Sequence, residues 1–207
     1  MAWDIDYATL AVFKNYVKVP LDDTEDDVEL ALALTAASRA VDRACFRQFG
    51  KSDTPEDRYF TAQWDNTLCA WIIRIDDVTD ATGLTIAYDS AHDETYSTSL
   101  SAFRLLPRNA ALKQRAYEEI QILRTSSGTP GGVDGAVRVH GTFGWSTVPD
   151  TVTQATLLQA SRFASRRDSP YGIAGSPDTG SELRLLAKVD PDVAVMLAGY
   201  RRKWGAV

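Results

Sequence analysis

The chain has 207 residues, of which 44% are hydrophobic and 24% are charged, proportions that are ordinary for a globular protein. The formal net charge is −6, which disfavours a nucleic-acid clamp because phosphate groups are bound through Lys and Arg. No apolar run reaches the roughly 20 residues of a membrane-spanning helix, and the two cysteines, Cys45 and Cys69, are too few for a disulfide scaffold or a multi-cysteine zinc site.

The N-terminal part of the chain predicts two helices. Residues 7–18 carry an apolar stripe at helical spacing, formed by Leu10, Phe13 and Val17. An acidic turn follows, in which six of the eight residues 22–29 are Asp or Glu, and it opens a long helix over residues 26–48. The stripe of that helix consists of Leu30, Leu34, Ala37, Val41 and Ala44. A second face of small residues would let another helix approach, from the same chain or a neighbouring copy; it consists of Ala33, Ala36 and Ala40.

The middle of the chain predicts short antiparallel strands, because β-branched and aromatic residues gather in runs that Gly and Asp clusters separate. These runs span residues 58–62, 68–75, 84–88, 117–123 and 136–142. The Gly-rich segment 126–132, between the last two runs, predicts a turn or a long hairpin tip.

The helical period returns in the last third. One helix is predicted from Pro149 to about Arg167, followed by a loop over residues 168–181. A final helix begins with Asp190 as N-cap and Pro191 at its first position, and its apolar stripe consists of Val193, Met196, Leu197, Tyr200 and Trp204. The order of helices, strands and helices predicts an α+β fold.

Residues suited to catalysis are few. His92 and His140 have no second His or Cys at ligand spacing, and residues 89–94 would bind a hard cation only weakly. Cys45 lies among apolar helix positions and is predicted to be buried, and no nucleophile or phosphate-loop motif occurs. We therefore expect a non-enzymatic protein with no metal and no cofactor.

Charge is distributed unevenly along the chain. Residues 1–100 hold 8 Lys and Arg against 19 Asp and Glu, a net charge of −11, whereas residues 101–207 hold 14 against 9, a net of +5. Ordinary surface charge accounts for this pattern. An alternative is a head-to-tail assembly, in which one half of a subunit attracts the other half of its neighbour.

Each of two basic segments allows either a role within the subunit or a role at an interface. Tyr200 and Trp204 flank three cationic residues, and they would form either an interface hot spot or part of the protein's own core. Residues 166–168 would either neutralise a helix C-terminus or pair with the acidic residues 22–29 of a neighbouring subunit.

The second half contains a characteristic series of motifs. The sequence GTFGWSTVP at residues 141–149 leads into helix residues 152–163, followed by residues 166–172 and 190–202. This series resembles the head–tail connector (adaptor) proteins of long-tailed bacteriophages and gene transfer agents. The opening of the chain, with a short helix, a Pro-Leu-Asp-Asp-Thr turn and a long Ala-rich helix, is similar to the family's opening.

The resemblance covers residues 7–50 and 135–207. It implies a connector core of about four helices formed by residues 1–52 and 145–207, with a β-rich module inserted at residues 53–144. Such subunits form a ring of about twelve copies beneath the portal protein. The ring extends the DNA channel and docks the stopper or tail-completion protein. Genomic double-stranded DNA passes through without tight binding, and the protein is made in the host cytoplasm and resides in the virion neck, away from membranes.

The resemblance also assigns candidate contact residues. Relatives engage the portal through the C-terminal helix or arm, which here gives Tyr200, Arg201, Arg202 and Trp204. The expected subunit-interface residues are Arg162, Arg166, Arg167, Asp168 and Tyr171. An acidic lumen repels phosphate, so the expected channel-lining residues are Asp22, Asp23, Asp26 and Asp27. A tail-completion component and a monomeric protein-binding module remain the alternatives.

Overall fold

The computed structural model describes residues 5–126, 128–167, 173–174, 183–184 and 190–202. Its helices and antiparallel sheets confirm the α+β class predicted from the sequence. The chain divides into two compact units. Among the described residues, 50–147 form the first, which we call the β unit, and 5–49 together with those from 148 to 202 form the second, which we call the helical unit.

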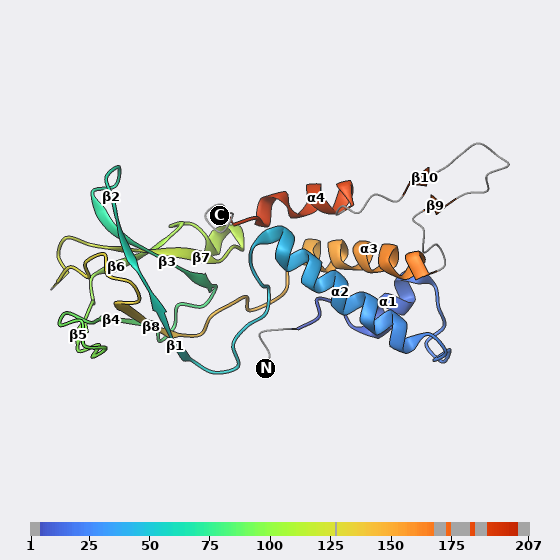
Figure 1. Ribbon diagram of the computed structural model, residues 1–207, viewed down its shortest axis with the longest axis horizontal. Coiled ribbons are helices and arrows are strands. Elements are labelled where there is room, and N and C mark those ends of the chain that lie inside the picture. The colour runs from blue at the N-terminus through green and yellow to red at the C-terminus, as the bar shows by residue number, and fades with distance from the viewer. Residues whose placement is uncertain (1–4, 127, 168–172, 175–182, 185–189, 203–207) are drawn as a thin grey trace. The chain divides into compact units, whose positions relative to one another are not determined.

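The helical unit contains four α-helices within the described residues (Figure 1). They are α1 (Leu10–Val17), α2 (Asp27–Cys45), α3 (Asp150–Arg167) and α4 (Pro191–Leu197), and α4 continues into the 3-10 turn η4 (Ala198–Tyr200). Helix α2 contacts each of the other three α-helices, so it forms the centre of this unit. Between α3 and α4, the two-residue strands β9 (Ile173–Ala174) and β10 (Leu183–Arg184) pair antiparallel; β9 lies within the predicted loop, and β10 follows its predicted end at residue 181.

Capping residues set the beginnings of α1 and α4. The hydroxyl of Thr9 accepts the N–H of Val12 at 3.3 Å, and the carboxylate of Asp190 accepts the N–H of Asp192 at 2.9 Å. Pro191 occupies the first position of α4, as predicted. The predicted length of this last helix is wrong, because the α-helix ends at Leu197 and Arg201 is extended.

The core of the helical unit lies where α2 and α3 cross. The predicted apolar stripe of α2 is buried except for Ala44, which is half-buried. Its first three residues pack against residues of α1 and α3, in a cluster that consists of Phe13, Leu30, Leu34, Ala37, Leu157 and Ala160. Ala37 and Ala160 are fully buried, and their small side chains let the two helices approach closely. The predicted small-residue face is only partly used, because Ala33 is half-buried and Ala36 is exposed.

The β unit contains two four-stranded antiparallel sheets. The first has the order β2–β3–β7–β6, with β2 (Ala62–Asp65), β3 (Ala70–Val78), β7 (Tyr117–Ile122) and β6 (Phe103–Leu106). The second has the order β1–β8–β4–β5, with β1 (Glu56–Phe60), β8 (Val137–Gly141), β4 (Thr85–Tyr88) and β5 (Thr98–Ser99). The 3-10 turn η2 (Ala111–Lys113) precedes β7.

Alternating side chains build one core from both sheets. In β8, Val137 and Val139 are fully buried while His140 is exposed, as a strand with a period of two requires. Ile73 of β3 and Ile120 of β7 belong to the same buried cluster as these valines. The β unit is therefore a small sandwich with its own hydrophobic core.

Of the two alternatives predicted for residues 126–132, a turn or a long hairpin tip, the hairpin tip is wrong, whereas Gly131 and Gly132 do form a turn. Strands β7 and β8 belong to different sheets, so the connecting segment crosses from one sheet to the other. Three strands of the β unit also escaped the sequence analysis: β2, β5 and β6. They have only two to four residues each and are partly exposed, so they lack an alternating apolar pattern.

Gly144 lies near the end of the β unit in sequence and packs against Gly50, where the chain enters the unit. Its φ angle of +104° lies in a region that side chains rarely adopt, and an added Cβ would lie 2.0 Å from the carbonyl oxygen of Gly50. The next residue, Trp145, donates its backbone N–H to that oxygen at 2.9 Å and its indole N–H to the buried Asp77 carboxylate at 2.7 Å. The segments that enter and leave the β unit are therefore hydrogen-bonded to each other.

Candidate interaction surfaces

Lys14 of α1 holds the acidic segment before α2 in place. Its side chain is almost completely buried, and Nζ donates to the backbone carbonyl oxygens of Leu21, at 3.2 Å, and Asp23. The same ammonium group forms an ion pair with Asp27 at 2.7 Å. A buried ammonium group requires such partners because burial removes its hydration. Lys14 therefore fixes the loop and neutralises one of its carboxylates.

The four predicted channel-lining residues lie together in this loop and the first turn of α2. Asp22 and Asp23 are exposed, Asp26 is half-buried at the N-cap, and Asp27 is half-buried against Lys14. The outward-facing negative charge of the loop thus comes mainly from Asp22 and Asp23.

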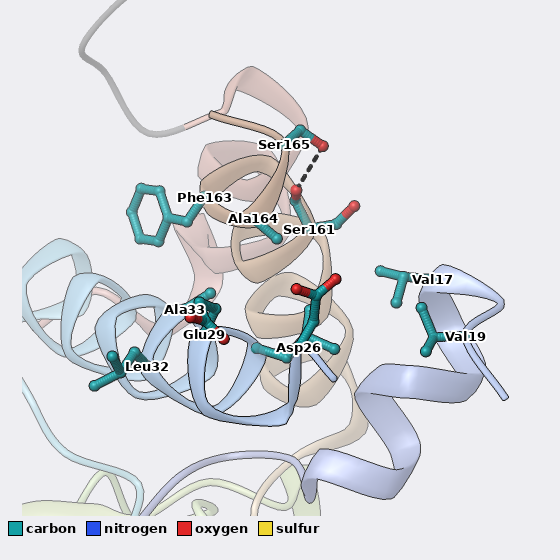
Figure 2. A pocket seen from close by; sticks show the side chains of 11 residues that line it. Val17, Val19, Asp26, Glu29, Leu32, Ala33, Ser161, Phe163, Ala164 and Ser165 are labelled. Carbon is teal, nitrogen blue, oxygen red and sulfur yellow. Dashed lines mark hydrogen bonds between the residues drawn. The ribbon is translucent and has the colours of Figure 1, made fainter. Parts of the chain in front are cut away.

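A groove of about 640 Å³ lies beside the acidic segment, between α1, α2 and α3 (Figure 2). Its apolar lining comes from Val17, Val19, Leu30, Leu32, Ala33, Phe163 and Ala164. Asp26 and Glu29 of α2 add carboxylates to the lining. Leu32 is 66% exposed, so the groove is open to solvent and presents apolar surface. Such a lining suits a partner that offers both an apolar side chain and positive charge.

The C-terminal segment packs on the end of α2. The rings of Tyr200 and Phe49 meet edge to face with centroids 5.7 Å apart. The backbone N–H of Arg202 donates to the carbonyl oxygen of Cys45 at 2.9 Å, and the Arg202 side chain is buried. Of the four predicted portal contacts, these two therefore support the helical unit itself. Arg201 is exposed, and Trp204 lies outside the described residues.

Arg43, Phe46 and Arg201 form a second surface, which we call the Phe46 patch. Phe46 ends α2 in the left-handed conformation (φ +54°), and its side chain is 39% exposed. The Arg201 guanidinium lies 5.8 Å from the centroid of this ring, and Arg43 is exposed one turn earlier on α2. An aromatic ring with flanking arginines is a composition enriched at interface hot spots.

The predicted subunit-interface residues cluster at the end of α3. Arg162 forms an ion pair with Asp190 at 3.1 Å and so links α3 to the start of α4. Arg166 lies one turn further along α3 and is half-buried. Arg167 ends the helix, but its side chain lies outside the described part of the chain, as do Asp168 and Tyr171.

A hydrogen-bonded group ties the N-terminal segment to α2. The hydroxyl of Tyr7 donates to Asp42 and accepts the N–H of Phe49 at 2.9 Å, while Arg39 pairs with Asp42 at 3.0 Å. Burial raises the pKa of the Tyr7 hydroxyl, and its hydrogen bond to Asp42 raises it further. Burial likewise raises the pKa of the Asp42 carboxyl. We interpret this group as structural, because it closes the core around Phe49.

The acidic loop after β4 is organised by its own backbone. The Asp89 carboxylate accepts the N–H groups of Ala91, His92 and Glu94 at 2.7–3.0 Å. Burial opposes ionisation of Asp89, but these hydrogen bonds outweigh it and lower the pKa of the carboxyl. Within the described residues, no three or more His, Cys, Asp or Glu side chains are placed to hold a metal ion.

His140 faces Asp57 across the β1–β8 pair, with Nδ1 2.7 Å from the carboxylate on an exposed face. Cys45 is fully buried, as predicted. No helix in the described part of the chain is long and apolar enough to cross a membrane.

The sequence analysis missed Lys14 and Phe46. Lys14 lies on the apolar face of the predicted first helix, but the sequence does not show the carboxylate and carbonyl partners that a buried lysine needs. Phe46 falls inside the predicted range of α2, and only the left-handed end of the helix at that residue exposes its ring. A signal for the position of that helix end was absent, because the residue that ends the helix is not glycine.

Comparison with known proteins gives an informative likeness among solved structures. No protein-family model matches the chain, and no curated protein matches it. A chain in the solved structure of the neck of an empty GTA (gene transfer agent) particle, computed with C6 symmetry, superimposes with a TM-score of 0.52 at 20% sequence identity. The superposition covers 94% of this chain and 89% of that chain. The two chains share a fold. The likeness extends through both the helical unit and the β unit.

Proposed function

We propose that this chain is a virion structural protein of the head–tail neck, where it acts as a head-to-tail adaptor. The observation that carries the proposal is the fold shared with a chain of a GTA particle neck over 94% of this chain. The motif series in residues 141–202, which resembles head–tail connector proteins, supports it independently. In this role the protein is not an enzyme, and it needs no cofactor.

The adaptor forms a ring of about twelve copies, closed by cyclic symmetry, beneath the portal protein. The neighbour's particle neck was computed with C6 symmetry, which supports a closed ring and is compatible with twelve copies, because a twelve-membered ring contains a six-fold axis. One face of the ring docks the stopper or tail-completion protein. Double-stranded DNA passes through the centre without tight binding, in keeping with the net charge of −6.

We assign three sets of contacts within this ring. The C-terminal residues contact the portal: Tyr200, Arg201, Arg202 and Trp204. Arg201 is the exposed member among the described ones, so it is the one we expect to touch portal side chains directly. The end of α3 and the following segment contact the neighbouring subunit: Arg162, Arg166, Arg167, Asp168 and Tyr171. The acidic segment faces the channel: Asp22, Asp23, Asp26 and Asp27.

Gold-labelled antibody imaging of tailed particles from the source virus tests the proposal. We expect label at the neck, between head and tail. Particles made without this gene provide the control, and they should carry no label. Label at the tail tip would support a tail-completion component instead. An absence of label on every particle, with protein found only in the lysate, would point to a protein-binding module outside the virion.

A further inference from the structure

The two ends of α2 carry surfaces of opposite character. At its N-terminal end lies the groove, with an apolar lining and the carboxylates of Asp26 and Glu29. At its C-terminal end lies the Phe46 patch, with an exposed ring and the guanidinium groups of Arg43 and Arg201. The two surfaces are therefore complementary: an exposed aromatic ring with positive charge on one matches an apolar groove with negative charge on the other.

The two surfaces cannot meet within one chain. Helix α2 has 19 residues, so at 1.5 Å per residue its ends are about 28 Å apart. Both surfaces are built on this helix and on elements that pack against it in the helical unit. Only a second copy of the chain can bring a Phe46 patch to the groove.

We propose that the Phe46 patch of one copy docks into the groove of the next copy. The Phe46 ring lies against the apolar lining near Leu32, and Arg43 faces Glu29, which leaves Asp26 to the channel and Arg201 to the portal as proposed above. This contact is heterologous, since each copy binds one neighbour through its Phe46 patch and the other neighbour through its groove. A heterologous contact that is repeated by a closing rotation generates a ring. The inference rests on the proposed ring and adds which faces of neighbouring subunits meet.

Sedimentation velocity of the full chain over a range of concentrations tests this contact. The salt concentration is about 0.15 M, at which charges more than about 8 Å apart are largely screened. We expect concentration-dependent association of the natural chain. Glu29→Arg and Arg43→Glu each place like charges across the contact and should weaken association about tenfold or more, a change equivalent to about 1.4 kcal/mol. Phe46→Ser should weaken it similarly, because it removes the apolar anchor.

An equimolar mixture of the Glu29→Arg and Arg43→Glu variants provides the decisive measurement. In the mixture every contact can again join opposite charges, so association should return to near the natural strength. A symmetric two-fold contact between unrelated faces would show no such rescue. Glu25→Arg is the matched control, because Glu25 is an exposed acid of the same segment that does not line the groove, and this change should leave association unaltered.

Three results would overturn the inference. They are a natural chain that stays monomeric at every concentration reached, single variants that associate as the natural chain does, and a mixture without rescue. The exposure of both charged residues keeps the variants folded, which circular dichroism verifies. The neck-labelling experiment is independent of this contact, so label at the neck combined with any of these results would reject the contact and keep the adaptor role.

Discussion

Lys14 lies on the same face of α1 as Leu10 and Val17, where the helical period places an apolar residue. The structure buries it and gives its ammonium group a carboxylate and two carbonyl oxygens as partners. The sequence indicates the stripe but not the partners, because they come from a loop whose conformation the lysine itself stabilises. The burial of a charged residue thus depends on tertiary contacts that no local pattern encodes.

Replacing Lys14 by Met tests this role at the residue scale. The apolar volume is retained, but Asp27 and the two carbonyl oxygens lose their donor, so we expect the free energy of unfolding to fall by about 2 kcal/mol. Urea denaturation monitored by circular dichroism measures the loss. Lys113→Met removes an exposed lysine and should change the free energy of unfolding by less than about 0.5 kcal/mol. Equal effects of the two changes would contradict the assigned role.

At the scale of elements, sequence patterns predicted helices better than strands. The stripe of α2 and the capping residues of α4 located these helices, because each signal lies within or next to the element itself, although α4 is shorter than predicted. The strands β2, β5 and β6 are short, and neighbouring strands rather than their own patterns define them. The pairing of β8 with β1 and β4 joins residues that are far apart in sequence, so the separation of β7 and β8 into two sheets could not be predicted from their spacing.

Gly144 is the element-scale position at which a single methyl group should be most disruptive. In Gly144→Ala the new Cβ would collide with the Gly50 carbonyl oxygen and occupy an unfavourable φ region. We expect a loss of about 3 kcal/mol or more in the free energy of unfolding. Gly131→Ala is the matched control, because Gly131 also has a positive φ but no atom within 4 Å of the added Cβ; it should cost only about 1 kcal/mol. A smaller loss for Gly144→Ala than for Gly131→Ala, in the same denaturation experiment, would contradict this prediction. It would show that the backbone around Gly144 and Gly50 shifts to make room for the added Cβ.

At the scale of the whole molecule, the helical unit and the β unit each bury an apolar cluster of their own. The candidate contact surfaces show how far sequence reasoning reached at this scale. It located the acidic segment and the basic C-terminal residues by composition. It could not show that Tyr200 packs on Phe49 and Arg202 bonds to the end of α2 while Arg201 faces solvent, because that distinction depends on the extended backbone that follows η4.

Two separate cores predict two unfolding transitions in differential scanning calorimetry. Leu34 is 2% exposed in the helical core, and Leu34→Ala should cost about 2–5 kcal/mol, so it should lower the temperature of one transition and leave the other in place. Ile73 is fully buried in the β core, and Ile73→Ala should lower the other transition alone. A single transition that both changes shift together would show that the two units unfold as one.

The hydrogen bond between Trp145 and Gly50 has a consequence for how such a chain can vary. Because the chain enters and leaves the β unit at adjacent points, the two connections to the helical unit lie side by side, whatever the length of the chain between Gly50 and Trp145. The β unit can therefore be enlarged, trimmed or exchanged as a cassette without altering the spacing that the helices must accommodate. A short Gly-Ser bridge in its place would close the same gap, so its strands are free to diverge while the helices stay fixed.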